Sequence, residues 1–259
     1  MNMPSASRAE GQGIPAVPAP EAGRAPSLRI LVWDAPVRVF HWLTVLCFAG
    51  AWLSAESERF RLLHVTLGYT LLGLVAFRLL WGVVGSRHAR FASFVRGPRA
   101  VLAYLRGLLR GAPAHTVGHN PAGALAIIAM LGLALAVGAT GWAAFDGPWA
   151  GAGEALGELH EGLASAMLAV VGVHVLGVIA SSWLHRENLV GAMFSGRKPG
   201  TLSTAGQGIR RAWPGVAALL LAAVLGFWAW QWQAAPDAAL GAAASALHRG
   251  DGHIDGDGD

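Results

Sequence analysis

The 259-residue sequence has little charge and almost no cysteine. Charged residues make up 13% of the chain and hydrophobic residues 54%, whereas a soluble domain carries about 25% charged residues. The single cysteine, Cys47, excludes an internal disulfide framework, a cysteine zinc site and the CxxCH attachment of a c-type haem. The chain is also too long for one anchor helix, so its composition predicts a membrane protein with several spans.

An apolar core is also missing from the N-terminal segment. Residues 1–28 are rich in Pro, Ala and Gly, so we expect no cleavable signal peptide there and a disordered cytoplasmic tail. At the other end, residues 237–259 contain five Asp and one Arg, which predicts an acidic tail on the outer, periplasmic side. Before that tail, we expect a linker and a further helix over 201–236.

Five apolar runs are long enough to cross a hydrocarbon core of about 30 Å. They cover residues 39–55 (in a helix beginning near 37), 62–86, 120–145, 162–184 and 212–236. No strand-like alternation competes with a helical interpretation of these runs. The predicted fold is therefore an all-α membrane protein: a four-helix transmembrane bundle plus a fifth C-terminal transmembrane helix.

Basic residues gather in alternate loops. The 87–119 loop has six arginines and no acidic residue, and the 185–211 segment has five basic residues. The intervening 142–161 loop has four acidic residues and no Arg or Lys. By the positive-inside rule the N-terminus lies in the cytoplasm and the C-terminus outside. The same segregation argues against nucleic acid as a partner, although the net charge is +4.

One cytoplasmic segment, "RAVLAYLRGLLRG" (99–111), alternates apolar and basic residues with helical spacing. We interpret it as an amphipathic helix lying on the membrane surface. An ordinary loop helix without lipid contact is the alternative.

Four histidines lie within or at the ends of the apolar runs. His160 and His174 are fourteen residues apart, which on an α-helix is about 21 Å of rise and a return to nearly the same face. Under the predicted topology His64 and His160 share the outer level, and His41 and His174 share the inner level. Ionisable groups at such depths are costly and usually functional. Two facing pairs on a helix bundle match two bis-histidine haems, one above the other.

Two other interpretations of these histidines carry less weight. Each histidine could be a hydrogen-bonded core residue. However, the four histidines form two pairs at two depths in the membrane, which argues for a shared role. A zinc site would need more ligands than the two nitrogens at each level. Glycines near the histidines would let a flat macrocycle approach the backbone; they are Gly68, Gly157, Gly162, Gly172 and Gly177.

Arg78 is the one charged residue inside the runs, and it follows His64 by fourteen residues. It is therefore expected on the same face at the inner level, where a haem propionate or a quinone headgroup would satisfy its charge. Snorkelling to the cytoplasmic interface is the alternative. Arg38 and Arg61 are similar candidates at the two surfaces. The remaining histidines are expected to be solvated or interfacial; they are His88, His115, His119, His185, His248 and His253.

Several longer stretches resemble a known family. They are "VWDAPVRVFHW", "RLLWGVVGSRHARFASFVRGP", "GHNPAG", "TGW", "LHE" followed by His174, and "RENLVGAMFSGRKP". Over residues 29–200 the chain resembles the bacterial cytochrome b561 family, which includes the b-type cytochrome subunit of nickel–iron hydrogenases. The fifth run has no histidine and departs from the four-helix pattern of that family.

The resemblance implies two haems b, held by His41, His64, His160 and His174. It also implies electron transfer between a membrane quinone and a redox partner at the outer face, such as a hydrogenase or a c-type cytochrome. Low-spin bis-histidine iron has no open position, so we expect an electron-transfer subunit without catalytic residues of its own. Two alternatives stay open: a superoxide–quinone oxidoreductase, for which Arg59 and Arg61 would form the outer arginine cluster, and a haemless membrane anchor.

Overall fold

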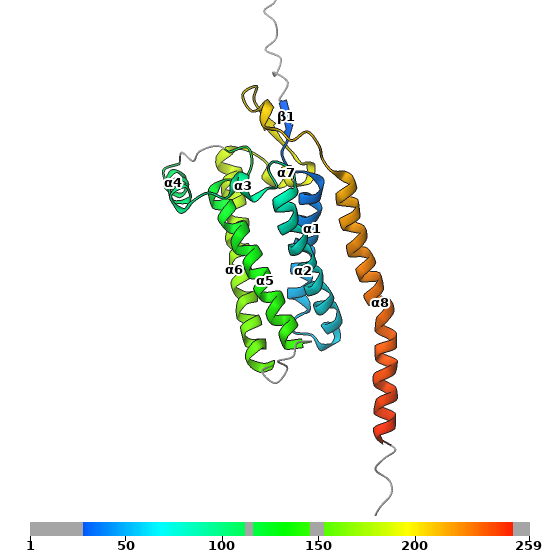
Figure 1. Cartoon of the computed structure of the whole chain (residues 1–259). Helices are drawn as coiled ribbons and strands as arrows, with labels where there is room; N and C mark the ends of the chain where they lie inside the picture. The colour runs from blue at the N-terminus through cyan, green and yellow to red at the C-terminus, as the bar shows by residue number, and fades with distance from the viewer. Residues whose placement is uncertain (1–27, 112–115, 146–152, 251–259) are drawn as a thin grey trace, which may run out of the picture.

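Five long helices dominate the structure, a computed structural model that describes residues 28–111, 116–145 and 153–250 (Figure 1). They are α1 (Ala35–Ser54), α2 (Arg61–Val84), α5 (Pro121–Phe145), α6 (Gly153–His185) and α8 (Pro214–Gly250). Within the described residues, five helical segments are long and apolar enough to cross a membrane. The predicted all-α membrane fold with five spans is therefore confirmed.

The start of α1 is determined by its local sequence. Asp34 caps the helix by accepting a hydrogen bond from the backbone N–H of Val37 at 2.8 Å, and Pro36 suits the first turn because its missing N–H would have no helical partner. The second carboxylate oxygen of Asp34 accepts from Trp81 Nε1 at 3.0 Å. This buried bond joins the start of α1 to the end of α2.

The spanning helices pack mainly as two antiparallel pairs, α1 with α2 and α5 with α6, and α2 joins the pairs by packing on α5. Small residues permit the close approaches. A Cβ added at Gly50 of α1 would lie 2.6 Å from Leu67 Cδ1 of α2, and one at Gly138 of α5 would collide with Leu72 of α2. By contrast, few residues of α6 approach α1 or α2.

Helix α8 lies against α1 and α2 on the side away from α6 (Figure 1). Leu220, Val224 and Trp228 pack on a buried cluster around Cys47, and Trp228 Nε1 donates to Thr70 Oγ1 at 2.9 Å. The apolar span of this helix ends at Ala234, close to the predicted boundary at 236, and the helix itself continues to Gly250. Residues 251–259 and the N-terminal tail lie outside the described residues.

A small cap covers the end of the bundle where α1 begins. Strands β1 (Leu28–Leu31) and β2 (Arg197–Gly200) pair antiparallel, with Leu31 opposite Arg197. The cap also contains α7 (Leu189–Ser195) and η3 (Ala205–Gln207). The all-helical expectation missed this strand pair because each strand has only four residues and no alternating pattern.

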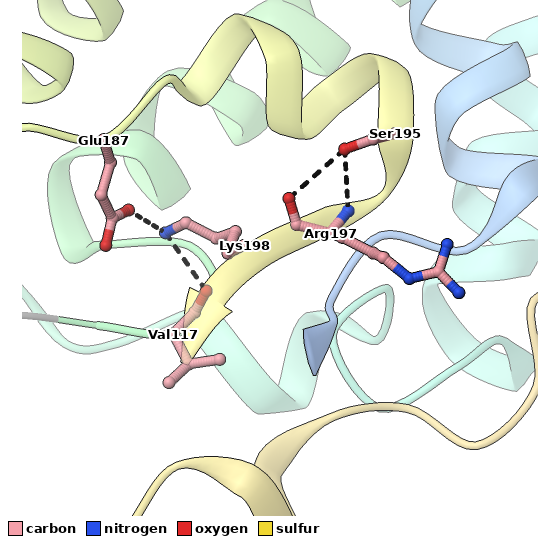
Figure 2. Close-up of polar contacts among 5 residues, drawn as sticks. All are labelled: Val117, Glu187, Ser195, Arg197 and Lys198. Carbon is pink, nitrogen blue, oxygen red and sulfur yellow. Dashed lines mark hydrogen bonds and ion pairs between the residues drawn. The ribbon is translucent and has the colours of Figure 1, made fainter. Parts of the chain in front are cut away.

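Buried polar contacts hold the cap in place. Lys198 of β2 forms an ion pair with Glu187 at 2.9 Å and donates to the Val117 carbonyl at 3.5 Å (Figure 2). Gly196 adopts φ +77°, which favours glycine, and its carbonyl accepts from two backbone N–H groups that follow β1. The cap is thus tied to the segments before α1, before α5 and after α6.

The loop between α2 and α5 contains two short helices, α3 (Phe91–Phe94) and α4 (Pro98–Leu109). The prediction of a helix in this segment is confirmed. Tyr104 is buried against the bundle, whereas Leu102, Leu105 and Leu109 are exposed. Figure 1 shows α4 nearly end-on while the spanning helices run lengthwise. This orientation agrees with a helix lying along the membrane surface.

Candidate functional site

The structure brings His64 and His160 together. His64 lies in the first turn of α2 and His160 on α6, and their ring centroids are 6.1 Å apart with the planes at 74°. An imidazole nitrogen binds a metal ion at about 2 Å, so an ion midway between two such rings holds their centroids about 6 Å apart. The spacing of this pair therefore fits one metal ion bound by both rings.

Backbone carbonyls orient both rings of this outer pair. His64 Nδ1 lies 2.8 Å from the Ala51 carbonyl oxygen of α1, and His160 Nδ1 lies 2.8 Å from the Val137 carbonyl oxygen of α5. A carbonyl can only accept, so each Nδ1 carries the hydrogen and donates. The lone pair then resides on Nε2, as metal-ligating histidines require.

Helix α5 shapes the site through residues that the sequence analysis did not identify. Thr140 Oγ1 donates to the Ala136 carbonyl at 2.8 Å, with the Val137 carbonyl also within reach at 3.0 Å, and it lies 3.4 Å from His160 Nδ1. A Cβ added at Gly141 would lie 2.9 Å from His160 Cε1. Only glycine therefore lets the His160 ring lie this close to α5. Its sequence signal was the "TGW" stretch, which was noted as a family motif without a role.

At the inner level, His41 of α1 and His174 of α6 lie near each other. Successive turns of α1 here carry buried polar atoms without a hydrogen-bond partner among the described residues: Arg38 Nε, His41 Nδ1 and Thr44 Oγ1. Buried polar groups are nearly always paired. A bound cofactor with polar groups at its edge would supply hydrogen-bond partners for these atoms.

Open space lies beside the glycines that flank the histidines. A Cβ added at any of five glycines would meet no atom within 4 Å; these are Gly68 of α2 and Gly157, Gly162, Gly172 and Gly177 of α6. Contact of α6 with α1 and α2 is also sparse. Small residues and few side-chain contacts therefore border the histidines, and the residues present fit a haem.

Arg78 is buried at the inner end of α2, with 3% of its surface exposed. Its guanidinium carbon lies 4.7 Å from the ring centroid of Phe91 and 6.0 Å from that of Phe94. Among the described residues its Nη1 has no hydrogen-bond partner. Two aromatic rings of α3 therefore enclose this charge, which does not extend to exposed surface as a snorkelling side chain would.

His119 and His88 were expected to be solvated or interfacial, and neither ring is solvated. The His119 ring packs between Trp33 at 4.5 Å and Phe94 at 4.4 Å, and its Nδ1 is buried. Burial, aided by the nearby positive charge of Arg78, lowers the pKa of His119 to about 3. His88 is also buried, and its Nε2 lies 2.8 Å from the Gln207 carbonyl oxygen. The cap covers both rings, an effect that loop composition does not reveal.

The two surface arginines differ. Arg38 Nη1 donates to the Phe194 carbonyl of α7 at 2.5 Å, one helical turn from His41. Arg61 is exposed and paired with Glu58 at 2.6 Å, while Arg59 lies over the Phe60 ring at 5.7 Å. Within the described residues at this end, the charge of Arg61 is thus offset by Glu58, which weakens the arginine cluster expected for a superoxide–quinone oxidoreductase.

Comparison with known proteins gives consistent matches. The model of the prokaryotic cytochrome b561 family matches residues 32–196. A probable Ni/Fe-hydrogenase 1 B-type cytochrome subunit of Escherichia coli is 28% identical over 142 residues, which are 44% of this chain and 60% of that protein. A probable Ni/Fe-hydrogenase B-type cytochrome subunit of Rhodobacter capsulatus is 24% identical over 213 residues. These residues are 65% of this chain and 81% of that protein. The chain thus spans about 60% of the length of the Escherichia coli relative. No solved structure matches the chain.

Proposed function

This chain belongs to the prokaryotic cytochrome b561 family, and from that premise we propose that it is a di-haem b-type cytochrome. In this proposal it transfers electrons between the membrane quinone pool and a redox partner at the outer face. The observation that carries the proposal is the outer pair, His64 and His160, with ring centroids 6.1 Å apart and both Nδ1 atoms held by carbonyls.

His64 and His160 would bind the outer haem iron through their Nε2 atoms, and His41 and His174 the inner one. A bound haem supplies a one-electron iron couple. Two histidines would hold each iron, so no position would be left open for a substrate. The role of the protein's own residues is therefore to bind, orient and enclose the two haems. Along the continuous helix α6, the two levels are about 21 Å apart, and haem edges would shorten the gap for electrons.

Polar groups at the inner end would hold the edges of the inner cofactor. Arg38 Nε and Thr44 Oγ1 lie one turn to either side of His41 and have no partner among the described residues. Arg78 adds a buried positive charge at the same level. A haem propionate or a quinone oxygen would accept hydrogen bonds from these donors and offset the cost of burying the charge.

The proposed setting is the bacterial inner membrane, with the N-terminus in the cytoplasm. The distribution of arginines supports this orientation. The partner we propose is a hydrogenase-type subunit, since the relatives are named as B-type cytochrome subunits of Ni/Fe hydrogenases. The partner would meet the end that carries His64 and His160.

A reduced-minus-oxidised absorption spectrum of the purified protein tests the proposal. Pyridine haemochrome analysis on the same sample should give two haems b per chain. A protein that purifies folded without b-type absorption would be a haemless anchor, and the proposal would be wrong. Addition of a reduced quinol should then reduce the haems in the purified protein. Failure of that step alone would remove quinone as the electron donor.

A further inference from the structure

Two adjoining pockets lie where the linker after β2 meets the start of α8. The first, of about 310 Å³, is lined by Ser86, Arg87, Arg210 and Arg211 among others, and we call it the basic pocket. The second, of about 520 Å³, runs from Arg211 and Trp213 along Pro214, Gly215 and Val216, and we call it the apolar pocket. The two pockets share Arg211 and Trp213.

The basic pocket concentrates positive charge that no carboxylate offsets. None of Arg87, Arg210 and Arg211 forms an ion pair within the described parts of the chain. Ser86 Oγ is buried and has no hydrogen-bond partner there either. Three guanidinium groups and a free hydroxyl donor at one site match the oxygens of a phosphate group.

Trp213 forms the boundary between the pockets. It is a non-glycine residue with φ +54°, a strained conformation that the surroundings maintain. The neighbouring Ala212 carbonyl accepts from Ala35 N–H at 2.8 Å, and the Trp213 ring meets the Trp81 ring edge-on at 5.8 Å. The backbone is thus held in place while Trp213 stays 41% exposed, with the Arg211 guanidinium carbon 6.0 Å from the centroid of its ring.

The position of the pockets corresponds to the membrane–water boundary. They lie at the common end of the bundle where α2 ends and where α1 and α8 begin (Figure 1). Tryptophan is enriched at this boundary in membrane proteins. The charged pocket therefore lies at headgroup depth, and the apolar pocket leads along α8 toward the hydrocarbon.

We propose that the two pockets together bind one anionic phospholipid of the inner leaflet. The phosphodiester would accept hydrogen bonds from the arginines and Ser86, and the glycerol and first acyl carbons would lie along Trp213 and Val216. A lipid with a choline headgroup also carries a phosphate, but its own ammonium group cancels the charge. The site should therefore prefer phosphatidylglycerol over phosphatidylcholine, and this site is independent of the haem proposal.

The test uses the full-length protein, exchanged into mixed micelles of detergent and lipid. Binding of brominated phosphatidylglycerol and brominated phosphatidylcholine is followed by quenching of tryptophan fluorescence. The pocket variant is Arg210→Gln with Arg211→Gln. The control, Arg29→Gln with Arg197→Gln, removes the same charge from exposed residues of the β1–β2 pair on the same side of the molecule. The Arg197 side chain points away from the Lys198–Glu187 pair (Figure 2).

We expect the wild type and the control to prefer phosphatidylglycerol, and the pocket variant to lose about fivefold in preference per arginine removed. Equal losses in both variants would show a diffuse surface charge and overturn the site. An unchanged preference in the pocket variant would also overturn it. Soluble glycerol phosphate is also tested as a competitor of brominated phosphatidylglycerol. If it competes as effectively as unlabelled phosphatidylglycerol, the pocket binds free phosphates and the lipid proposal is wrong. An unchanged far-ultraviolet circular dichroism spectrum shows that each variant is folded.

Discussion

The Nδ1 atom of His64 lies 2.8 Å from the carbonyl oxygen of Ala51, so α1 orients a side chain of α2. This carbonyl is one of the last four of α1, which lack a backbone N–H partner within the helix, and it also accepts from Ser54 Oγ at 3.2 Å. His160 makes the equivalent bond to Val137 in the middle of α5. The two rings are thus oriented from opposite sides of the bundle, and each exposes Nε2 for a metal.

The histidine pairs predict which haem each substitution removes. His64→Ala and His160→Ala should each abolish the outer haem, because iron loses one of two axial ligands. His41→Ala and His174→Ala should each abolish the inner haem. Pyridine haemochrome analysis with redox titration identifies which haem is lost. Two haems retained in any one variant would exclude that residue as a ligand.

Gly141 offers a finer test of the outer site. Gly141→Ala places a methyl group 2.9 Å from His160 Cε1, closer than side chains tolerate, so the ring must shift. We expect weaker outer haem binding, measured as faster haem transfer to apomyoglobin. Gly132→Ala on the same helix is the matched control, since a methyl group there meets no atom within 4 Å. Equal rates in the two variants would mean that Gly141 does not position His160.

Arg78 is expected to set the potential of the inner haem. If its partner is a propionate, Arg78→Leu leaves a poorly compensated anion that favours ferric iron. The inner midpoint should then fall by tens of millivolts, on a scale where ~59 mV is a tenfold change in a one-electron equilibrium. Arg78→Lys keeps the charge, and Arg61→Leu changes an exposed outer arginine; neither should produce that fall. If the Arg78→Leu variant keeps both haem midpoint potentials and its reactivity with quinol, the prediction is wrong.

His119 should make the protein sensitive to acid. Its pKa is lowered to about 3 from 6.5, so below pH 6.5 the unfolded chain binds a proton that the folded chain does not. Stability is therefore complete above pH 6.5 and falls as the pH drops toward 3, by about 2 kcal/mol at pH 5. His119→Gln should reduce the loss of melting temperature between pH 7 and pH 5. The lowered pKa of buried His88 adds in the same direction, so His88→Gln is measured alongside. Equal pH dependence in wild type and His119→Gln would contradict the prediction.

Topology can be tested without the cofactor. A periplasm-active reporter fused after Asp259 should be active, and one fused at Gly111 inactive, because the arginine-rich loops remain inside. The opposite result at Asp259 would require an even number of spans. It would also move the outer end of α8 to the cytoplasm.

Much of the site could be predicted from the sequence because depth along a helix follows from residue number. Hydropathy identifies the five spans, and the rise per residue predicts His64 level with His160, whose ring centroids lie 6.1 Å apart in the structure. The same arithmetic predicts His41 level with His174. The apolar run gives the membrane span of α8, but it does not give the alanine-rich continuation of the helix to Gly250.

The tertiary structure alone decided which groups surround those histidines. The Ala51 and Val137 carbonyls, the close approach at Gly141 and the burial of His119 all depend on contacts between segments far apart in the chain. Periodicity gives the face and depth of a residue on its own helix. It does not give the neighbouring helix or the angle at which that helix packs, because these are set by many weak long-range contacts acting together.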